Sequence, residues 1–221
     1  MNIYDVMGPI MVGPSSSHTA GACRLGLLAN RILGAKVARA MIYLHGSFAE
    51  TYRGHGTDMA LLAGLMGWAP DDSRIPEAEK YAQESGLEYS YNKIDLGAGT
   101  HPNTVLFKLT AENGCYTEIV GSSIGGGQVL ITEIDGFEVK LNGKLPALLV
   151  IHVDRPGLIA LVGSTMASFG VNIATMEVFR DAKGGRASMI LECDNVVPDA
   201  AIDIIRRLPN VEAVRFVACV E

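Results

Sequence analysis

Cysteine is scarce in this chain of 221 residues. There are four cysteines, widely scattered and without a CxxC pair: Cys23, Cys115, Cys193 and Cys219. We expect no disulfide framework, because such frameworks belong to small secreted chains with dense, patterned cysteines. Iron–sulfur clusters need several thiolates brought together, and this pattern does not supply them locally. Any cluster ligands would therefore come from another polypeptide.

Long hydrophobic runs and an excess of positive charge are also missing. Arg, Asp or His interrupts the most apolar stretches well before the roughly 18 residues that a membrane span needs. Residues 1–6 show neither the basic nor the apolar region of a signal peptide. The net charge is −6 and no basic stripe stands out. We expect a cytoplasmic protein that binds neither membranes nor nucleic acid.

Several common catalytic signatures are not found. The sequence has no P-loop, no dinucleotide fingerprint and no HExxH pair, which argues against nucleotide binding and against a self-contained zinc site. It has no convincing nucleophile elbow of the GxSxG type. Three of the five histidines, His18, His55 and His101, instead lie beside hydroxyl or amide side chains.

Hydrophobic periodicity predicts an α+β domain over residues 1–143. Helical spacing of apolar residues predicts helices at 19–33, 58–66 and 76–85. Apolar or alternating runs predict strands at 37–44, 88–96, 104–110, 116–120, 128–134 and 137–141. The pairs Asn113-Gly114 and Asp135-Gly136 predict hairpin turns. Helices come early in this domain, and an antiparallel sheet is expected late.

A turn-rich segment at 142–146 precedes a second domain, predicted over residues 146–221. Its expected elements are a strand at 148–153, a helix at 158–169, strands at 172–180 and 187–193, a helix starting at Pro198 and a strand at 211–217. This order is βαββαβ, the ferredoxin-like arrangement.

The segment Gly13–Gly21 has the sequence GPSSSHTAG and lies directly before a predicted helix. Free N–H groups and the dipole of a helix N-terminus favour an anion, so a carboxylate or phosphate can bind there. The candidate contacts are Ser15, Ser16, Ser17, His18 and Thr19. The alternative is a plain helix cap, which needs one hydroxyl rather than four.

Two further segments combine histidine with small polar residues. Arg53–Asp58 has the sequence RGHGTD and exposes His55 between two glycines, where an imidazole suits proton transfer near neutral pH. Thr100–Thr104 has the sequence THPNT, in which the proline favours an extended His101 and Asn103 can bind a carboxylate or an amine. Structural loops with capping side chains are the alternative for both segments.

Glycine is abundant, with 25 residues, and forms a triplet within Ser122–Gly127, which has the sequence SSIGGG. Consecutive glycines between strands can offer several backbone N–H groups to an anion. A glycine-rich turn or bulge is the alternative.

Two turns of the second domain carry information beyond topology. Asp154–Gly157 (DRPG) leads from strand to helix, and Gly170–Ile173 (GVNI) leads from that helix into the next strand. Together they resemble the ACT domain, a small amino-acid-sensing module of metabolic enzymes. The resemblance implies side-by-side self-association, with a regulatory ligand at the shared interface near Gly157, Asn172 and Ile173. A module that serves only for dimerisation is the alternative.

Taken together, GPSSSHTAG, HGSFAETYRGHGTD, HPNT and SSIGGG resemble, in order and spacing, the beta chain of iron–sulfur-dependent L-serine dehydratase in its two-subunit form. The resemblance spans residues 1–127, and the ACT-like module covers most of the rest. It implies an N-terminal α/β sandwich similar to the allosteric substrate-binding domain of phosphoglycerate dehydrogenases. It also implies a lyase of amino-acid metabolism and gluconeogenesis that converts L-serine, through an aminoacrylate, to pyruvate and ammonia.

The same resemblance implies roles for individual residues. His55 is the first choice for the catalytic acid or base, and His101 is the second. The residues expected to bind L-serine are Ser15, Ser16, Ser17, His18, Thr19 and Asn103. A [4Fe–4S] cluster, without a metal ligand from this chain, would come with the alpha chain and make the enzyme a hetero-oligomer.

Two other functions stay open. A non-catalytic regulatory subunit would bind an amino acid and dimerise through its ACT module, although clustered hydroxyls and exposed imidazoles argue against it. A pyridoxal-phosphate dehydratase would need a Schiff-base lysine. Lysines such as Lys36, Lys80 and Lys93 lie in ordinary amphipathic or loop contexts, which disfavours that chemistry.

Overall fold

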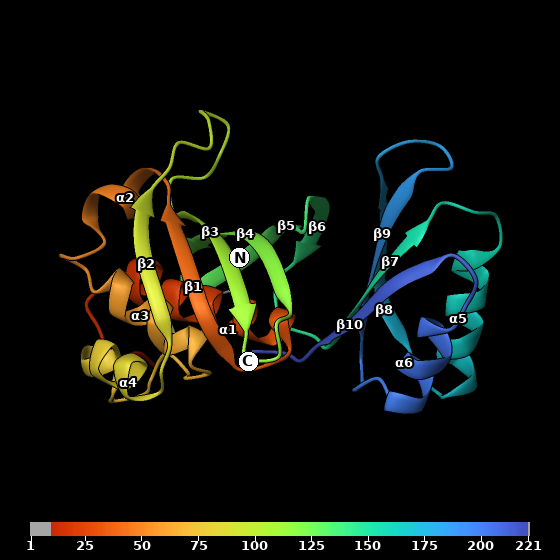
Figure 1. Ribbon diagram of the computed structural model, residues 1–221, viewed down its shortest axis with the longest axis horizontal. Coiled ribbons are helices and arrows are strands. Elements are labelled where there is room, and N and C mark those ends of the chain that lie inside the picture. The colour runs from red at the N-terminus through yellow and green to blue at the C-terminus, as the bar shows by residue number, and fades with distance from the viewer. Residues whose placement is uncertain (1–9, 221) are drawn as a thin grey trace. The chain divides into compact units, whose positions relative to one another are not determined.

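The computed structural model describes residues 10–220, and the chain divides into two compact units (Figure 1). The first unit ends at Asp135, and the second runs from Gly136 to Cys219. Helices and strands occur in both units, which confirms the α+β class. None of the described helices is long and apolar enough to cross a lipid bilayer.

The first unit opens with a π-helical turn at Ser16–Ala20 that continues directly into α1. Its helices are α1 (Gly21–Leu33), α2 (Gly46–Thr51), α3 (Thr57–Leu65) and α4 (Ala78–Glu84). Its strands are β1 (Val37–Leu44), β2 (Glu88–Lys93), β3 (Thr104–Ala111), β4 (Tyr116–Gly125) and β5 (Gln128–Ile134), and β6 (Phe137–Leu141) follows. The predicted elements are confirmed to within a few residues, but α2 and the second half of β4 were not predicted.

The strands of the first unit, together with β6, form one sheet with the hydrogen-bonded order β2-β1-β3-β4-β5-β6. The pairs β1–β3, β3–β4 and β4–β5 are antiparallel, as expected, whereas β1 and β2 are parallel. Parallel neighbours need a long crossover connection, and here the chain supplies one through α2, α3 and α4. The expectation of a purely antiparallel sheet was therefore wrong at this edge.

One face of the sheet is covered by α1, which contacts β4 and β5, and α3 packs against α1 (Figure 1). Side chains alternate accordingly: Ile42 on β1 and Phe107 on β3 are fully buried, while their neighbours on the other face are half-buried. The two helices approach closely because Gly26 and Gly64 face the opposite helix, where a Cβ on either would overlap backbone atoms. The close approach brings the N-terminal ends of both helices to one place.

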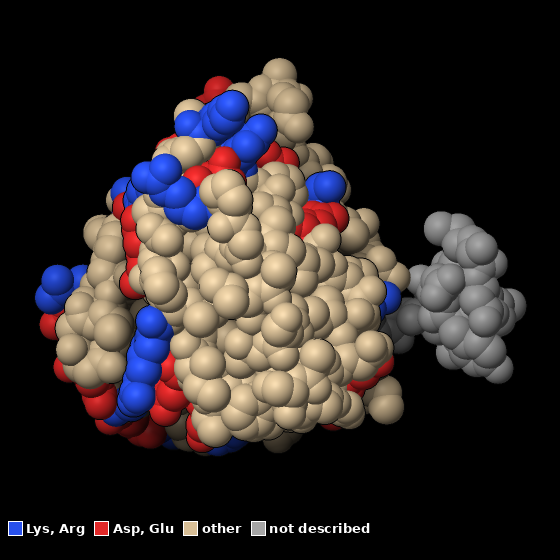
Figure 2. Space-filling model, turned by 90° about the vertical axis from the view of Figure 1, so that its right-hand side faces the viewer, with Lys and Arg blue, Asp and Glu red and all other residues tan. Residues whose placement is uncertain are grey.

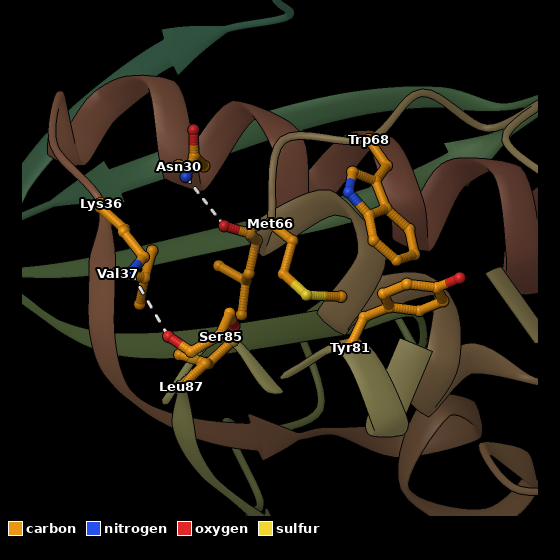
Figure 3. Close-up of a pocket in the computed structure, with 9 residues that line it drawn as sticks. Asn30, Lys36, Val37, Met66, Trp68, Tyr81, Ser85 and Leu87 are labelled. Carbon is orange, nitrogen blue, oxygen red and sulfur yellow. Dashed lines mark hydrogen bonds between the residues drawn. The ribbon is translucent and has the colours of Figure 1, made fainter. Parts of the chain in front are cut away.

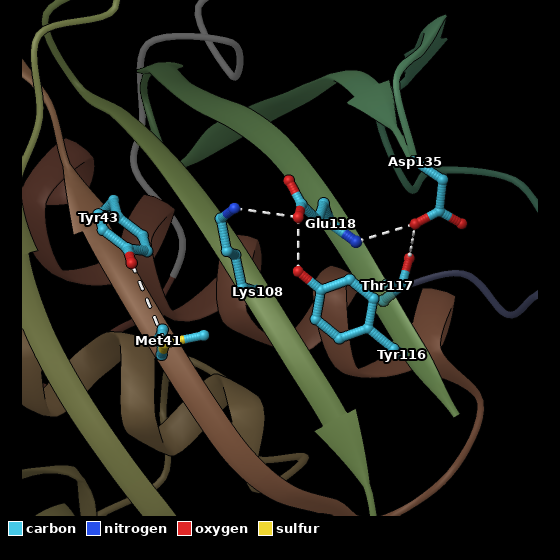
Figure 4. A network of polar contacts seen from close by, with 7 residues as sticks. All are labelled: Met41, Tyr43, Lys108, Tyr116, Thr117, Glu118 and Asp135. Carbon is cyan, nitrogen blue, oxygen red and sulfur yellow. Dashed lines mark hydrogen bonds and ion pairs between the residues drawn. The ribbon is translucent and has the colours of Figure 1, made fainter. Parts of the chain in front are cut away.

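The other face of the sheet carries a polar network across β3 and β4 (Figure 4). Glu118 accepts hydrogen bonds from the Tyr116 hydroxyl and from Lys108 Nζ, its partner across the strands, and both bonds lower the pKa of Glu118. At the end of the next hairpin, Asp135 and Gly136 both have positive φ, 52° and 80°. This is the geometry of a type I′ turn, and it confirms the predicted hairpin.

The second unit contains β7 (Ala147–Val153), α5 (Leu158–Ser168), β8 (Ile173–Arg180), β9 (Arg186–Cys193), α6 (Asp199–Arg206) and β10 (Val211–Val217). Its sheet has the order β10-β7-β9-β8 with antiparallel pairing throughout. The predicted βαββαβ arrangement is confirmed. Its core joins strand residues such as Leu148 and Leu191 to Val162 on α5 and Ile205 on α6.

Strand β6 belongs to the second compact unit. β6, with Val139 and Leu141 buried, contacts β8 and β9, and Ser188 Oγ donates to the Glu138 carbonyl at 3.1 Å. The first compact unit accordingly ends at Asp135. The domain limits 1–143 and 146–221 stay a prediction.

Candidate active site

The segment Ser15–Thr19 forms a tight turn at the N-terminal end of α1. Ser15 Oγ accepts a hydrogen bond from the His18 N–H at 3.1 Å and caps the turn. It also lies 3.4 Å from Ser17 Oγ, while Ser16 is half-buried in the same turn. The cap therefore uses the Ser15 hydroxyl, and a cap alone does not explain the hydroxyl groups of Ser16, Ser17 and Thr19.

The His18 imidazole lies between two hydroxyl groups. Its Nδ1 is 3.1 Å from Ser17 Oγ, and its Nε2 is 3.1 Å from Ser47 Oγ on α2. The ring packs edge-on against Phe48, with the centroids 5.2 Å apart. Burial, and next the nearby His55, lowers the pKa of His18. The neutral ring is thereby favoured, with both of its nitrogens in contact with side chains that can donate or accept.

His55 is the direct neighbour of His18, with ring centroids 4.9 Å apart. Its Nδ1 lies 3.3 Å from the Thr51 carbonyl at the end of α2. A carbonyl only accepts, so Nδ1 carries the hydrogen and the lone pair of the neutral ring is on Nε2. Thr19 Oγ1 donates to the His55 carbonyl at 3.0 Å and ties the two histidine segments together. This geometry suits His55 as a proton acceptor.

Ser123, near the end of β4, joins two further segments to this pair. Its Oγ donates to the Ser17 carbonyl and its N–H donates to the Asn103 carbonyl, each at 2.9 Å. Ser123 is fully buried, and a Cβ on Gly21 would overlap its hydroxyl. The spacing of Gly121–Gly125 matches GxSxG, but Ser123 lies on a strand and its hydroxyl is already used, so it is not a nucleophile elbow.

The HPNT loop reaches the site through its backbone. His101 is exposed, and its Nδ1 accepts from the Asn103 N–H at 3.1 Å within the same turn. Thr104 Oγ1 donates to the His101 carbonyl at 2.6 Å and lies 2.7 Å from Ser122 Oγ. His101 is thus not a member of the His18–His55 ring pair. Ser122 and Ser123 belong to β4 and not to a loop between strands, because they continue its pairing with β3 and β5.

Two contacts of the site were missed from the sequence, those of Ser47 and Phe48 on α2. The glycine-punctuated stretch between residues 45 and 58 gave no helical periodicity, so α2 was not expected. No local pattern in this stretch marks Ser47 as a partner of His18, which lies 29 residues away along the chain. Gly46 packs so closely on the backbone of Pro102 that a Cβ would not fit. This contact sets the start of α2 and hence the position of Ser47.

The fit of a [4Fe–4S] cluster to this chain can be tested on its cysteines. Cys23 and Cys193 are buried, Cys115 is exposed and Cys219 is half-buried. Burial raises the pKa of Cys23 to about 12, which disfavours the thiolate that a cluster requires. Within residues 10–220 no three His, Cys, Asp or Glu side chains gather into a metal site. The residues described here do not form a cluster site.

The predicted regulatory residues lie at the two ends of α5. Gly157, with φ of 92°, precedes the helix, and Asn172 and Ile173 follow it. Asn172 Nδ2 donates to Asp194 Oδ2 at 2.6 Å. α5 has 11 residues, which at about 1.5 Å per residue separates its ends by about 16 Å. A small ligand bound to a single copy of the module therefore cannot contact both Gly157 and Asn172.

We expect the histidine pair to make stability depend on pH. Because the folded pKa of His18 is lowered, the unfolded chain, near pKa 6.5, takes up its proton first as the pH falls. The stability that neutral His18 contributes should decline as the pH falls below about 6.5. The decline should end once the pH is below the pKa of His18 in the folded chain. Urea unfolding followed at about pH 7.5 and about pH 5.5 should show a smaller decline in His18→Asn than in the original chain.

The matched control is His101→Asn, which removes a histidine from an exposed loop. An equal decline in His18→Asn and in the original chain would contradict the pKa direction assigned to His18.

Comparison with known proteins gives a consistent result over the whole chain. The family described as serine dehydratase beta chain matches residues 3–94, and the ACT domain family matches residues 147–210. The chain is 42% identical over 217 residues to the probable L-serine dehydratase, beta chain, of Bacillus subtilis, covering 98% of each. It is 35% identical over 214 residues to the L-serine dehydratase, beta chain, of Peptoniphilus asaccharolyticus, covering 97% of this chain and 96% of the relative.

A more distant relative has a different overall length. The D-3-phosphoglycerate dehydrogenase of Synechocystis sp. is 28% identical over 188 residues, which cover 85% of this chain but 34% of that protein. The beta-chain relatives, in contrast, are matched along nearly their entire length. The chain therefore belongs to the family of L-serine dehydratase beta chains, and its second unit carries an ACT domain.

Proposed function

We propose that this chain supplies the acid–base half of an active site that converts L-serine to pyruvate and ammonia. The observation that carries the proposal is the His18–His55 pair, 4.9 Å apart at the N-terminal end of α1 and surrounded by hydroxyl groups. The [4Fe–4S] cluster of this proposal belongs to an alpha chain, because the described residues offer it no ligand set. The complete enzyme is then a cytoplasmic hetero-oligomer.

Substrate binding is assigned to the turn at Ser15–Thr19, because it lies at a helix N-terminus. The carboxylate of L-serine is an anion, and the N–H groups and dipole of a helix N-terminus favour anions. Ser16 and Ser17 lie in this turn, directly before α1, and Asn103 is brought beside it by Ser123. In the proposal, these residues hold the carboxylate and the amino group, and Thr19 positions the loop of His55.

Proton transfer is assigned to His55. Its Nε2 lone pair takes the Cα proton, while His18, kept neutral by burial, avoids a second positive charge beside it. Loss of this proton together with the β-hydroxide removes one water and leaves an aminoacrylate. Its imine tautomer takes up one water and releases ammonia, so pyruvate remains and all atoms balance. His101, exposed and outside the pair, is the second choice for a proton-transfer role.

A second candidate function is supported by the phosphoglycerate dehydrogenase relative. The matched stretch covers 85% of this chain but only 34% of the phosphoglycerate dehydrogenase. The same two units thus accompany a different reaction, which favours a non-catalytic, amino-acid-binding regulatory role. Histidine variants separate the two functions.

We expect His55→Gln to lower kcat of the complex reconstituted with the alpha chain by about 10²–10⁴-fold, the usual contribution of a positioned acid or base. The visible absorbance of the cluster should stay unchanged, because residues 10–220 offer no ligand set for it. The measurement is pyruvate formation from L-serine under anaerobic conditions. His101→Gln should lower kcat less. Unchanged turnover in both variants would favour the regulatory function and reject the catalytic one.

We also propose that two ACT modules associate through α5. Figure 2 shows a broad surface without charged side chains on the side of the second unit where α5 lies. On α5 and at its C-terminal end, Ile159, Leu161 and Phe169 are exposed to 49%, 48% and 37%, and α5 contains no charged residue. Exposed apolar patches of this kind mark interaction sites. Pairing would bring Gly157 of one copy toward Asn172 and Ile173 of the other.

Leu161→Glu should shift the chain from dimer to monomer in analytical ultracentrifugation, because it buries a charge in the proposed interface. The matched control is Val196→Glu, an apolar-to-acidic change at a residue of the same unit that is 66% exposed and lies outside α5. The control should leave the dimer intact. Equal effects of the two changes would contradict the assignment of α5.

A further inference from the structure

A pocket of about 280 Å³ opens in the first unit where α1, α3 and α4 end and β1 and β2 begin (Figure 3). It lies at the C-terminal end of α1, whereas the histidine pair lies at the N-terminal end. The 13 residues of α1 separate the two places by about 20 Å at about 1.5 Å per residue. The pocket is therefore not part of the site for L-serine.

The interior of the pocket is apolar. Its floor consists of Val37, Leu65 and Leu87, which are exposed to only 4%, 1% and 5%. Its walls include the half-buried side chains of Trp68 and Tyr81, which point into the same space in Figure 3. Apolar floors with aromatic walls are typical of sites for small molecules, although this one is at the small end of the range. It fits a compact apolar group better than a polar one.

The aromatic wall is held in place before any ligand arrives. The Arg74 guanidinium lies 4.1 Å from the centroid of the Trp68 ring, and the Tyr81 ring meets Trp68 edge-on at 5.2 Å. Arg74 is itself fixed by two hydrogen bonds to the Asp72 carboxylate, at 2.9 and 2.6 Å, and these lower the pKa of Asp72. A preorganised wall reduces the ordering cost of binding.

The rim of the pocket carries Lys36, which forms an ion pair with the Glu112 carboxylate. Lys36 Nζ lies 2.6 Å from Glu112 Oε1 and 3.3 Å from the Ser85 carbonyl. Both side chains of the ion pair are 58% exposed, and exposed pairs of this kind contribute little to stability. A carboxylate from a ligand can therefore replace Glu112. Among the described lining residues, Lys36 is the charged one.

We propose that this pocket binds a small monocarboxylic acid with an apolar aromatic or branched tail. The tail occupies the floor between Val37, Leu65 and Leu87, against Trp68, and the carboxylate pairs with Lys36. L-Serine does not fit this description, because it has no apolar group to place on the floor. The ligand is thus a second kind of molecule, and its binding is independent of the proposed function.

The test uses the full-length chain and 3-phenylpropionate as the probe. Trp68 is the single tryptophan of the chain, so its fluorescence reports on this pocket without a label. We expect a saturable change in Trp68 emission, with about tenfold weaker binding in Lys36→Gln, as for the loss of one charge-assisted hydrogen bond. The uncharged probe 3-phenylpropanol should bind the original chain about as weakly.

Two variants complete the design. Lys93→Gln is the matched control, because Lys93 is also an exposed lysine paired to a carboxylate, Glu50 at 2.9 Å, in the same unit. It should bind the probe like the original chain. Ser85→Phe, at the exposed rim, should block the saturable change without disturbing the core.

Three results would overturn the proposal. One is a change in emission that rises linearly without saturating, and another is equal affinity in Lys36→Gln and in the original chain. The third is the absence of any response to the probe in the free chain, combined with a change in Trp68 emission when the alpha chain is added. That result would assign the pocket to a side chain of the partner.

Discussion

The two hydrogen bonds of Ser123 hold the candidate site together. Its hydroxyl fixes the Ser17 carbonyl and its amide fixes the Asn103 carbonyl, so the end of β4 joins two loops that are far apart in sequence. The residue is fully buried against Gly21, where no larger side chain fits. Since the turn at Ser15–Thr19 carries His18, the position of the whole histidine pair depends on this contact.

The histidine pair shows how a common structural arrangement yields two different imidazoles. His18 is enclosed by Ser17, Ser47 and Phe48, which lowers its pKa and keeps it neutral. His55 donates from Nδ1 to a helix carbonyl and keeps the Nε2 lone pair available. One ring is therefore suited to orient its surroundings and the other to move a proton. Helix–helix contact through Gly26 and Gly64 supports both, because it aligns the starts of α1 and α3.

The sequence predicted most elements because local periodicity and turn chemistry determine them: the type I′ turn at Asp135-Gly136 and the βαββαβ order are examples. The parallel pairing of β1 with β2 could not be predicted, since it depends on where the crossover returns to the sheet. Ser47 was missed for a similar reason. It lies 29 residues from His18, and a contact at that separation leaves no local pattern. The motifs named His18, His55 and His101 as candidates, but they did not show that His18 and His55 would be neighbours or that His101 would face its own turn.

The replacement Ser123→Ala tests the central claim most directly, with the pKa of His18 followed by NMR titration of its imidazole. It removes one hydroxyl and should destabilise the fold by only about 1 kcal/mol. The account predicts that the turn at Ser15–Thr19 loosens, that the pKa of His18 rises toward its ordinary value and that serine turnover falls. An unchanged pKa of His18, together with unchanged turnover, would show that Ser123 does not position the site.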